Sequence, residues 1–483
     1  MKYYFSILLF TAIALISCGE GSDDPDEKNK SNINITLRSQ TIEEGAEIDA
    51  GTSVLTLNYN TTVKVTGSGI TINGTNVTAK SNEKTSMSVD IPLTLEAGMS
   101  YVVKVSKGAI VSSIDAAVSV PELTINFRTK AKPQSVISAT PVAATTDTAQ
   151  KLYAYFLEQY GKKTISSVMA NVNWNNNCAE KVFKLTGKYP AMNCYDFIHI
   201  CIPKNNWINY NDITPVTDWV QAGGIVQLMW HFNVPVSKDK VNAITASGSD
   251  TDGNKVLTCT PGETTFRATN VFTEGSWENK WFYQEMDKVI AVILKLQEAG
   301  IAATWRPFPE AAGNAIAKQQ AGWTKAWFWW GYDGADTYKK LWTTMFDYFK
   351  QNGVHNLIWI WTSQNYNGNA TQYNQDTDWY PGEDYVDMVA RDLYGYSAAQ
   401  NYQEFTEIQD TYPHKMVVLG ECGKGDAGDS GTIGDCWTAG AKWGHFMVWY
   451  QGGQGSTDTM CSDAWWKNAM TDSHVITRDQ VKF

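Results

Sequence analysis

Two glutamates follow short apolar segments of the kind that form buried strands. Glu310 ends the sequence TWRPFPE, and Glu421 follows the sequence VVLG. Two opposed carboxyl groups can hydrolyse a glycosidic bond when one is neutral and protonates the leaving oxygen while the other is charged and attacks the anomeric carbon. Alternation along a strand places Arg306 on the face of Glu310, where its charge would hold a neighbouring carboxylate ionised. A single glutamate after a strand is usually a surface residue, so this hypothesis depends on the pair.

The elements expected to position the pair lie in the second part of the chain, where apolar segments alternate with amphipathic ones. The eight expected strands are 165–171, 191–198, 224–231, 301–308, 356–362, 387–393, 415–420 and 445–450. Amphipathic stretches at 281–299 and 338–351 are typical of helices between such strands. Eight repeats predict a (β/α)8 barrel, in which the fourth and seventh strands would bring the two glutamates to one mouth. An open doubly wound sheet is the alternative, although no GxGxxG sequence follows an early strand.

The first part of the chain has a different composition. All 20 tryptophans lie in the range 174–466. Residues 32–130 are instead rich in Thr, Val, Ile, Ser and Asn in short alternating runs, which predict an all-β sandwich. This segment resembles a bacterial Ig-like module and has no titratable cluster, so we expect it to be a spacer. We expect a linker at 131–141 and a catalytic barrel domain at 142–483.

The N-terminus is typical of an exported lipoprotein. Residues 1–17 have the basic start and short apolar run of a signal peptide. The sequence LISC matches a bacterial lipobox and predicts lipid attachment at Cys18, followed by an acidic tether at 18–31. We therefore expect an outer-membrane lipoprotein, exposed at the cell surface. Seven further cysteines, an odd number without a CxxC pair, suggest neither a zinc site nor a redox motif.

Charge and aromatic content narrow the class of ligand. The formal net charge is −11, which argues against nucleic acid because proteins that bind phosphate backbones carry an excess of Lys and Arg. The chain has 20 Trp and 23 Tyr. Flat apolar rings with a polar edge are suited to a sugar-binding cleft, although any single tryptophan is more often part of a core.

At the motifs around the two glutamates the chain resembles glycoside hydrolase family 26. The matching sequences are RPFPE at 306–310, WFWWG at 327–331, LGECG at 419–423, WHFN at 230–233, DLYG at 392–395 and FMVWY at 446–450. The resemblance covers residues 140–483 and implies a retaining (β/α)8 enzyme of clan A, in a family of mostly endo-β-1,4-mannanases. It implies that Glu310 is the acid/base and Glu421 the nucleophile.

The same resemblance suggests further site residues. The expected substrate-binding residues are His231, Arg306, Trp327, Trp330, Asp392, Tyr394 and Trp449. The Tyr394 hydroxyl is expected to orient Glu421, and the three tryptophans to stack on sugar rings. We expect Trp329 and Trp359 to pack in the core. No metal or cofactor is expected, and the acidic loop 376–384 is interpreted as solvated surface rather than as a Ca²⁺ site.

Two departures from the family pattern bear on the substrate. Pro309 stands where the family usually has a His that contacts the sugar near O2, where mannose differs from glucose. A longer segment, 311–326, follows Glu310 and would reshape the subsites for the leaving group. The leading hypothesis is a monomeric endo-β-1,4-mannanase acting on plant mannan, glucomannan or galactomannan. The alternatives are a retaining β-xylanase or mixed-linkage β-glucanase, or a catalytically weak surface glycan-binding protein.

Overall fold

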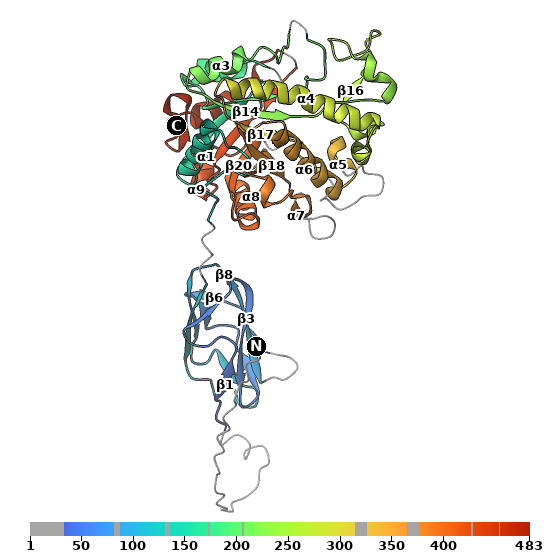
Figure 1. Ribbon diagram of the computed structural model, residues 1–483. Helices are drawn as coiled ribbons and strands as arrows, with labels where there is room; N and C mark the ends of the chain where they lie inside the picture. Colours follow the sequence, from blue (N-terminus) through green and yellow to red (C-terminus); the bar gives the residue numbers. More distant parts are fainter. Residues whose placement is uncertain are drawn as a thin grey trace, which may run out of the picture. The chain divides into compact units, whose positions relative to one another are not determined.

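The computed structural model describes residues 33–81, 87–130, 136–171, 174–204, 207–313, 326–364, 376–426, 428–453 and 455–483. The chain divides into two compact units, Met1–Gln134 and Ser135–Phe483, and each unit has a hydrophobic core of its own (Figure 1). The expected signal peptide, Cys18 and the acidic tether lie outside the described residues. The finer boundaries expected at 131 and 142 stay predictions.

The first unit is built from short strands. They are β1 (Leu37–Gln40), β2 (Ala46–Ile48), β3 (Gly51–Tyr59), β4 (Val63–Val65), β5 (Ile70–Ile72), β6 (Thr75–Asn76), β7 (Lys80–Ser81), β8 (Ser88–Leu95), β9 (Ser100–Val105), β10 (Ile110–Ser112) and β11 (Leu123–Thr129). The sheet orders are β1-β3-β8-β7 and β2-β11-β9-β5-β6, and β10 pairs with β4. Along β3 the side chains of Leu55, Leu57 and Tyr59 are buried while those between them are more exposed, as a half-buried strand requires. The expected all-β sandwich is confirmed.

The second unit contains eight parallel strands in a closed ring. They are β12 (Thr164–Met169), β13 (Met192–Asp196), β14 (Ile225–Trp230), β17 (Ala303–Pro307), β18 (Leu357–Ser363), β19 (Met388–Tyr394), β20 (Met416–Gly423) and β21 (His445–Val448). Each strand pairs with the next, and β12 closes the ring by pairing with both β13 and β21. A short strand, β24 (Val475–Ile476), adds to β12. The expected (β/α)8 barrel is confirmed, and all eight strands overlap the predicted ranges.

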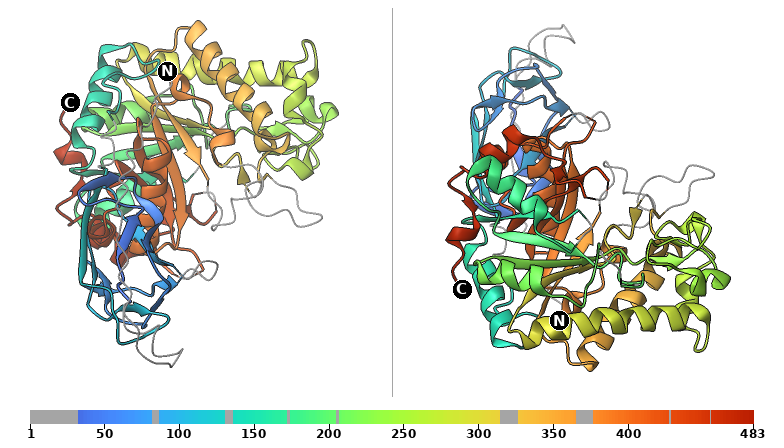
Figure 2. Two further views of the ribbon diagram at one scale, coloured as in Figure 1. Left: turned by 90° about the horizontal axis from the view of Figure 1, so that it is seen from below. Right: turned by 90° about the horizontal axis from the view of Figure 1, so that it is seen from above.

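Helices cover the outside of the barrel, as Figures 1 and 2 show. The main ones are α1 (Asp147–Gln159), α2 (Asn177–Thr186), α3 (Thr214–Gln221), α4 (Trp277–Glu298), α6 (Ala335–Gln351), α8 (Ala398–Thr411), α9 (Ile433–Ala439) and α10 (Asp463–Ala469). The shorter elements of this unit are β15 (Val234–Pro235), β16 (Leu257–Thr258), η1 (Lys238–Ala243), η2 (Pro261–Glu263), η3 (Ala268–Phe272), α5 (Trp329–Tyr332), α7 (Asp376–Trp379), η5 (Glu383–Tyr385), β22 (Tyr450–Gln451), β23 (Asp458–Thr459) and η6 (Arg478–Gln480). Within the described residues, none of the helices has the length and apolar content to cross a membrane.

Several boundaries differ from the sequence prediction, and three of these differences bear on the site or have a clear local cause. Helix α4 begins at Trp277, earlier than expected, because the Ser276 side chain caps it by accepting from the Asn279 N–H at 2.9 Å. Strand β17 ends at Pro307, one residue early, because Phe308 adopts a left-handed conformation with φ of 47°. Strand β20 continues to Gly423, so Glu421 lies inside the strand rather than after it.

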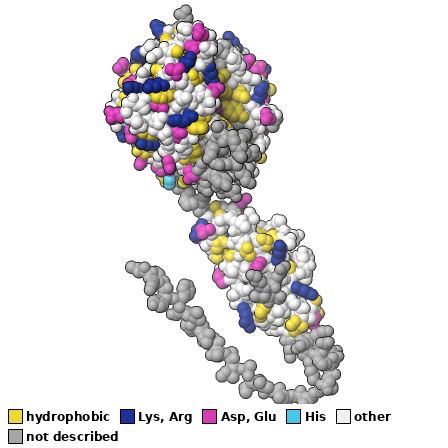
Figure 3. All heavy atoms as spheres, turned by 90° about the vertical axis from the view of Figure 1, so that its right-hand side faces the viewer, with side chains coloured by type: hydrophobic (Ala, Val, Ile, Leu, Met, Phe, Trp, Pro, Cys, Tyr) yellow, Lys and Arg dark blue, Asp and Glu magenta, His cyan; other side chains and the backbone are white. Residues whose placement is uncertain are grey.

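Charged side chains of both signs share the face shown in Figure 3. On the face shown in Figure 3, the Lys and Arg side chains of the described residues are interspersed with Asp and Glu. A protein that follows a phosphate backbone would present basic side chains gathered along one stripe. The described residues on this face show no such stripe.

Because each unit has a separate core, we expect residues 136–483 to fold alone. The melting temperature of this fragment, followed by circular dichroism, should lie within about 3 °C of the corresponding transition in the full chain. A fragment that melts without a cooperative transition would show that the barrel depends on the first unit for its stability.

Candidate active site

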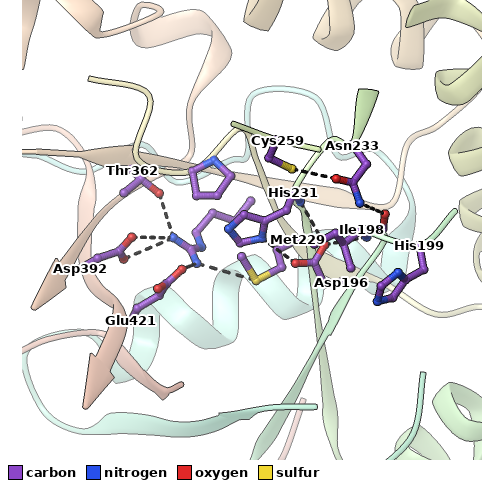
Figure 4. Close-up of polar contacts among 12 residues, drawn as sticks. Asp196, Ile198, His199, Met229, His231, Asn233, Cys259, Thr362, Asp392 and Glu421 are labelled. Carbon is purple, nitrogen blue, oxygen red and sulfur yellow. Dashed lines mark hydrogen bonds and ion pairs between the residues drawn. The ribbon is translucent and has the colours of Figure 1, made fainter. Parts of the chain in front are cut away.

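The guanidinium of Arg306, on β17, is fully buried at the centre of the site. Its Nη1 donates to Asp392 Oδ2 at 3.0 Å and to Thr362 Oγ1 at 3.1 Å, and its Nη2 donates to Glu421 Oε1. These contacts, with a longer one from Nη2 to Met229 Sδ at 3.8 Å, can be followed in Figure 4. Two carboxyl groups from neighbouring strands therefore share one buried cation.

The position of Glu421 depends on an irregularity in the pairing of β19 with β20. Arg391 lies opposite Leu419, but Asp392 lies opposite Glu421, so Gly420 is an additional residue in β20. A Cβ atom at Gly420 would lie 2.6 Å from Asp392 Oδ1, which explains why this position has no side chain. The bulge turns Glu421 toward the same guanidinium that Asp392 contacts.

Both oxygens of the Glu421 carboxyl group are held. Arg306 contacts Oε1, and the Tyr394 hydroxyl donates to Oε2 at 2.5 Å. A cation and a hydroxyl donor both stabilise the charged form of a carboxyl group. The hydrogen bond from Tyr394 to Glu421 is the contact that the sequence predicts. Burial raises the pKa of the neighbouring Asp392, Arg306 opposes that shift, and the charge of Glu421 adds to it.

Glu310 has the opposite environment. It lies in the turn after β17 and remains partly exposed at the mouth of the barrel. Burial raises the pKa of Glu310 well above its ordinary value, the negative charges of Glu421 and Asp392 raise it further, and Arg306 opposes them. The group is therefore a carboxylic acid that keeps its proton beside a carboxylate.

The alternation expected to link Arg306 and Glu310 is wrong. The strand ends at Pro307, and both Phe308 and Glu310 have positive φ angles, of 47° and 51°. A period of two cannot continue through a turn of this kind, because left-handed residues change the direction of the chain. Arg306 nevertheless lies close enough to Glu310 for its charge to affect the pKa of that carboxyl group.

His231 is fixed by an aspartate that the sequence analysis missed. Its Nδ1 lies 2.6 Å from Asp196 Oδ2, and its backbone N–H donates to Asp196 Oδ1 at 3.0 Å (Figure 4). Because a carboxylate only accepts, a neutral His231 donates from Nδ1 and keeps Nε2 as an acceptor. Its ring also meets Trp449, with the centroids 5.7 Å apart. Asp196 ends the second strand of the barrel, which is the signal that could have identified it.

The tryptophans divide into two groups. Trp327 is 38% exposed and Trp449 is partly buried, so both can present a ring face to a ligand. Trp330 was expected to do the same, but it is fully buried and its Nε1–H donates to the Pro309 carbonyl at 2.8 Å. That prediction is wrong, because an indole enclosed on all sides has no free face for a sugar. Trp329 and Trp359 are buried in the core, as predicted.

Two other expectations also change. The side chains of Arg306 and Asp392 are buried and contact each other, and Arg306 also contacts Glu421, so neither lies at the expected sugar-binding surface. In the acidic loop, Asp378, Glu383 and Asp384 are exposed, as expected for solvated surface. Asp376 differs from these three residues because it is not solvated surface: its carboxylate accepts hydrogen bonds from the Gln364 N–H at 2.7 Å and from the Tyr412 hydroxyl at 2.8 Å.

The longer segment expected to reshape the leaving-group subsites, 311–326, lies mostly outside the described residues, which include only 311–313 and 326 of it.

The bulge at Gly420 gives a prediction about stability. Replacing Gly420 by Ala should lower the free energy of unfolding by about 1–3 kcal/mol, because the added methyl group would overlap the Asp392 carboxylate. Urea denaturation measures this change. The matched control is Gly262→Ala, whose Cβ has no atom within 4 Å and should change stability by less than about 0.5 kcal/mol. Equal effects of the two substitutions would contradict the close contact.

Comparison with known proteins agrees with this geometry. The GH26 domain of an endo-β-mannanase/endo-β-glucanase from Prevotella bryantii is 52% identical, covering 72% of this chain and 100% of that chain, with a TM-score of 0.66. A β-mannanase from a symbiotic protist of the termite Reticulitermes speratus, solved with a gluco-manno-oligosaccharide, is 31% identical, covering 72% of this chain and 98% of its own, with a TM-score of 0.55.

The curated relatives are also named as mannan-degrading enzymes. A mannan endo-1,4-beta-mannosidase from Thermothelomyces thermophilus is 26% identical over 344 residues, which is 69% of this chain and 61% of the relative. The match covers 61% of the length of the Thermothelomyces enzyme, and 52% and 44% of the lengths of two mannan endo-1,4-beta-mannosidases from Piromyces. The chain therefore spans less than two thirds of each of these relatives. Residues 141–480 match the sequence model of the family described as Glycosyl hydrolase family 26. The chain therefore belongs to glycosyl hydrolase family 26.

Proposed function

We propose that the chain is a retaining endo-glycosidase that hydrolyses internal β-1,4-mannosidic bonds in mannan, glucomannan or galactomannan. The observation that carries this proposal is the opposite state of two neighbouring carboxyl groups. Glu421 is held by Arg306 and Tyr394, whereas burial and the negative charges of Glu421 and Asp392 raise the pKa of Glu310. The names of the relatives support β-mannan as the substrate.

In the first step, Glu310 protonates the glycosidic oxygen while Glu421 attacks the anomeric carbon. The bond to the leaving sugar breaks and an ester forms between the glycone and Glu421. Arg306 and Tyr394 hold both oxygens of Glu421, which orients the carboxylate before the attack. Glu310 leaves this step as a carboxylate, because its proton has passed to the leaving group.

The second step follows from the change in charge. Once Glu421 is an ester it has no negative charge, so one of the groups that raises the pKa of Glu310 is lost. Glu310 can then remain ionised and accept a proton from water, which attacks the anomeric carbon from the side that the leaving group has vacated. The ester breaks, Glu421 regains its charge and the product keeps the β configuration. Two carboxyl groups suffice for this cycle, and no cofactor takes part.

The other site residues are proposed to bind and orient the sugar. His231, oriented by Asp196, presents Nε2 beside Trp449, where it can accept from a hydroxyl group. Trp327 and Trp449 offer aromatic faces on which the C–H groups of a pyranose can stack. Arg306, Asp392 and Tyr394 act on the substrate through Glu421.

Pro309 gives a specific reason to consider a second class of substrate. A proline side chain cannot donate a hydrogen bond near O2, so discrimination between mannose and glucose would be weaker there. Retaining cleavage of β-xylan or mixed-linkage β-glucan is therefore the second candidate. Release of reducing sugar from galactomannan, glucomannan, xylan and lichenan decides between them. Hydrolysis of xylan or lichenan without hydrolysis of the mannans would contradict the proposed substrate.

We also propose that the protein is a monomeric lipoprotein of the outer membrane, exposed at the cell surface. The support is the lipobox that ends at Cys18 and the acidic tether that follows it. Incorporation of labelled palmitate into the intact chain, but not into a Cys18→Ala variant, is the expected result. Equal labelling of both proteins would contradict lipid attachment at Cys18.

Replacing each glutamate separately should distinguish the two roles. Glu421→Ala should lower hydrolysis of every substrate by several orders of magnitude, because no covalent intermediate can form. Glu310→Ala should be equally poor on polysaccharide. On an aryl glycoside with a good leaving group, Glu310→Ala should release a rapid burst of the aryl group, because that group departs without a proton. Hydrolysis of the covalent intermediate should then be slow, because no base activates water.

Added azide then identifies the roles by stereochemistry, which NMR of the product measures. With Glu310→Ala, azide should restore turnover and give a β-glycosyl azide, because it attacks the covalent intermediate. With Glu421→Ala, any azide product should have the inverted configuration. The reverse pattern would require the two roles to be exchanged.

A further inference from the structure

The turn that carries Glu310 is strained. Phe308 and Glu310 both lie in the left-handed region, with φ angles of 47° and 51°, and neither is a glycine. Such residues are unfavourable unless their surroundings hold them in place. The direction of the Glu310 side chain therefore depends on the groups that contact residues 308–313.

The carbonyl group of Pro309 has a dedicated partner. The Nε1–H of Trp330 donates to it at 2.8 Å, inside a fully buried environment. The carbonyl oxygen of Pro309 and the amide nitrogen of Glu310 belong to the same peptide plane. The pyrrolidine ring already fixes φ of Pro309, so this plane, together with the φ of 51° at Glu310, sets the direction from which the Glu310 side chain leaves the chain.

Trp330 is itself held rigidly. Its ring stacks on Phe328, with the centroids 4.4 Å apart and the planes 14° from parallel. The next residue, Gly331, lies so close to the turn that a Cβ atom there would meet the Ala311 carbonyl oxygen at 1.8 Å. The start of α5 is therefore packed directly against the acid/base turn.

The far end of the turn has a second support. The N–H of Gly313 donates to Gln364 Oε1 at 2.6 Å, and the Gln364 N–H is in turn bound by Asp376 at 2.7 Å. Gln364 follows the last residue of β18. The turn is thus held at Pro309 by Trp330 and at Gly313 by Gln364.

We infer that Trp330 is a positioning residue for proton transfer, which fixes the Pro309–Glu310 peptide so that the Glu310 carboxyl group reaches the glycosidic oxygen. Gln364 supports the same turn from its other end. This inference rests on the proposed role of Glu310 as the proton donor. It replaces the sugar-stacking role that the sequence suggests for Trp330, because the ring is enclosed by protein.

The test is the substitution Trp330→Phe, which keeps an aromatic ring and removes the N–H donor. The matched control is Trp329→Phe, since the Nε1–H of the equally buried Trp329 donates to the Phe232 carbonyl at 2.6 Å. Each variant loses one buried hydrogen bond from an indole to a carbonyl group. The two variants should therefore lose similar thermal stability, and only Trp330→Phe should change the chemistry of the proton transfer.

The readout is the rate of the glycosylation step for two kinds of leaving group. For Trp330→Phe, single-turnover cleavage of a manno-oligosaccharide should fall about 10- to 100-fold, because a displacement of about 1 Å can cost this much. Cleavage of 2,4-dinitrophenyl β-mannobioside should fall less than about threefold, because that group leaves without a proton. Trp329→Phe should change both rates by the same factor.

A second variant keeps the test decisive if Trp330→Phe does not fold. Gln364→Leu, at a partly exposed position, should show the same selective loss on the oligosaccharide, with a smaller factor. Equal losses on both substrates in the folded variants would overturn the inference, because that is the result of a merely structural role. Glu310→Ala separates the hypotheses. If Glu310→Ala shows the selective loss on the oligosaccharide and the two positioning variants do not, only the positioning role of Trp330 and Gln364 is contradicted. If Glu310→Ala does not show the selective loss, the role of Glu310 as the proton donor is contradicted.

Discussion

The site depends on one buried cation shared by two carboxyl groups. Arg306 is fully buried, and its contacts with Asp392 and Glu421 offset the large cost of removing a guanidinium from water. When Asp392 and Glu421 are both ionised, one positive charge cannot neutralise them, and the cluster then has an excess of negative charge. A third carboxyl group placed beside this cluster is driven to keep its proton. Glu310 is that group, and its pKa is raised by burial first and then by the charges of Glu421 and Asp392.

This account joins the fold to the chemistry. Strands β17, β19 and β20 supply Arg306, Asp392 and Glu421, and a parallel barrel brings the corresponding ends of these strands to one mouth. The bulge at Gly420 then sets the register that turns Glu421 toward the guanidinium. Glu310 comes from a turn rather than from a strand, so its position needs separate support. The contacts of Trp330 and Gln364 with that turn provide it.

Much of the fold could be predicted because its signals are local. The eight barrel strands lie in short segments rich in apolar residues, several of which are separated by amphipathic stretches, and each strand overlaps the predicted range. The two glutamates could be identified because each lies near the C-terminal end of such a strand. The bulge could not, because the register of β19 against β20 depends on the fit between Gly420 and the Asp392 side chain. The burial of Trp330 and the partnership of Asp196 with His231 likewise depend on contacts between distant segments.

The central claim is that the charge of Glu421 helps to hold the proton on Glu310. A carbon-13 NMR titration of the glutamate carboxyl groups tests it directly, with the Glu310 resonance assigned by its loss in Glu310→Gln. Replacing Glu421 by Gln removes the negative neighbour while keeping the shape of the side chain. The account predicts that the pKa of Glu310 is above its ordinary value in the intact chain and falls in Glu421→Gln. An unchanged pKa of Glu310 in that variant would contradict the account.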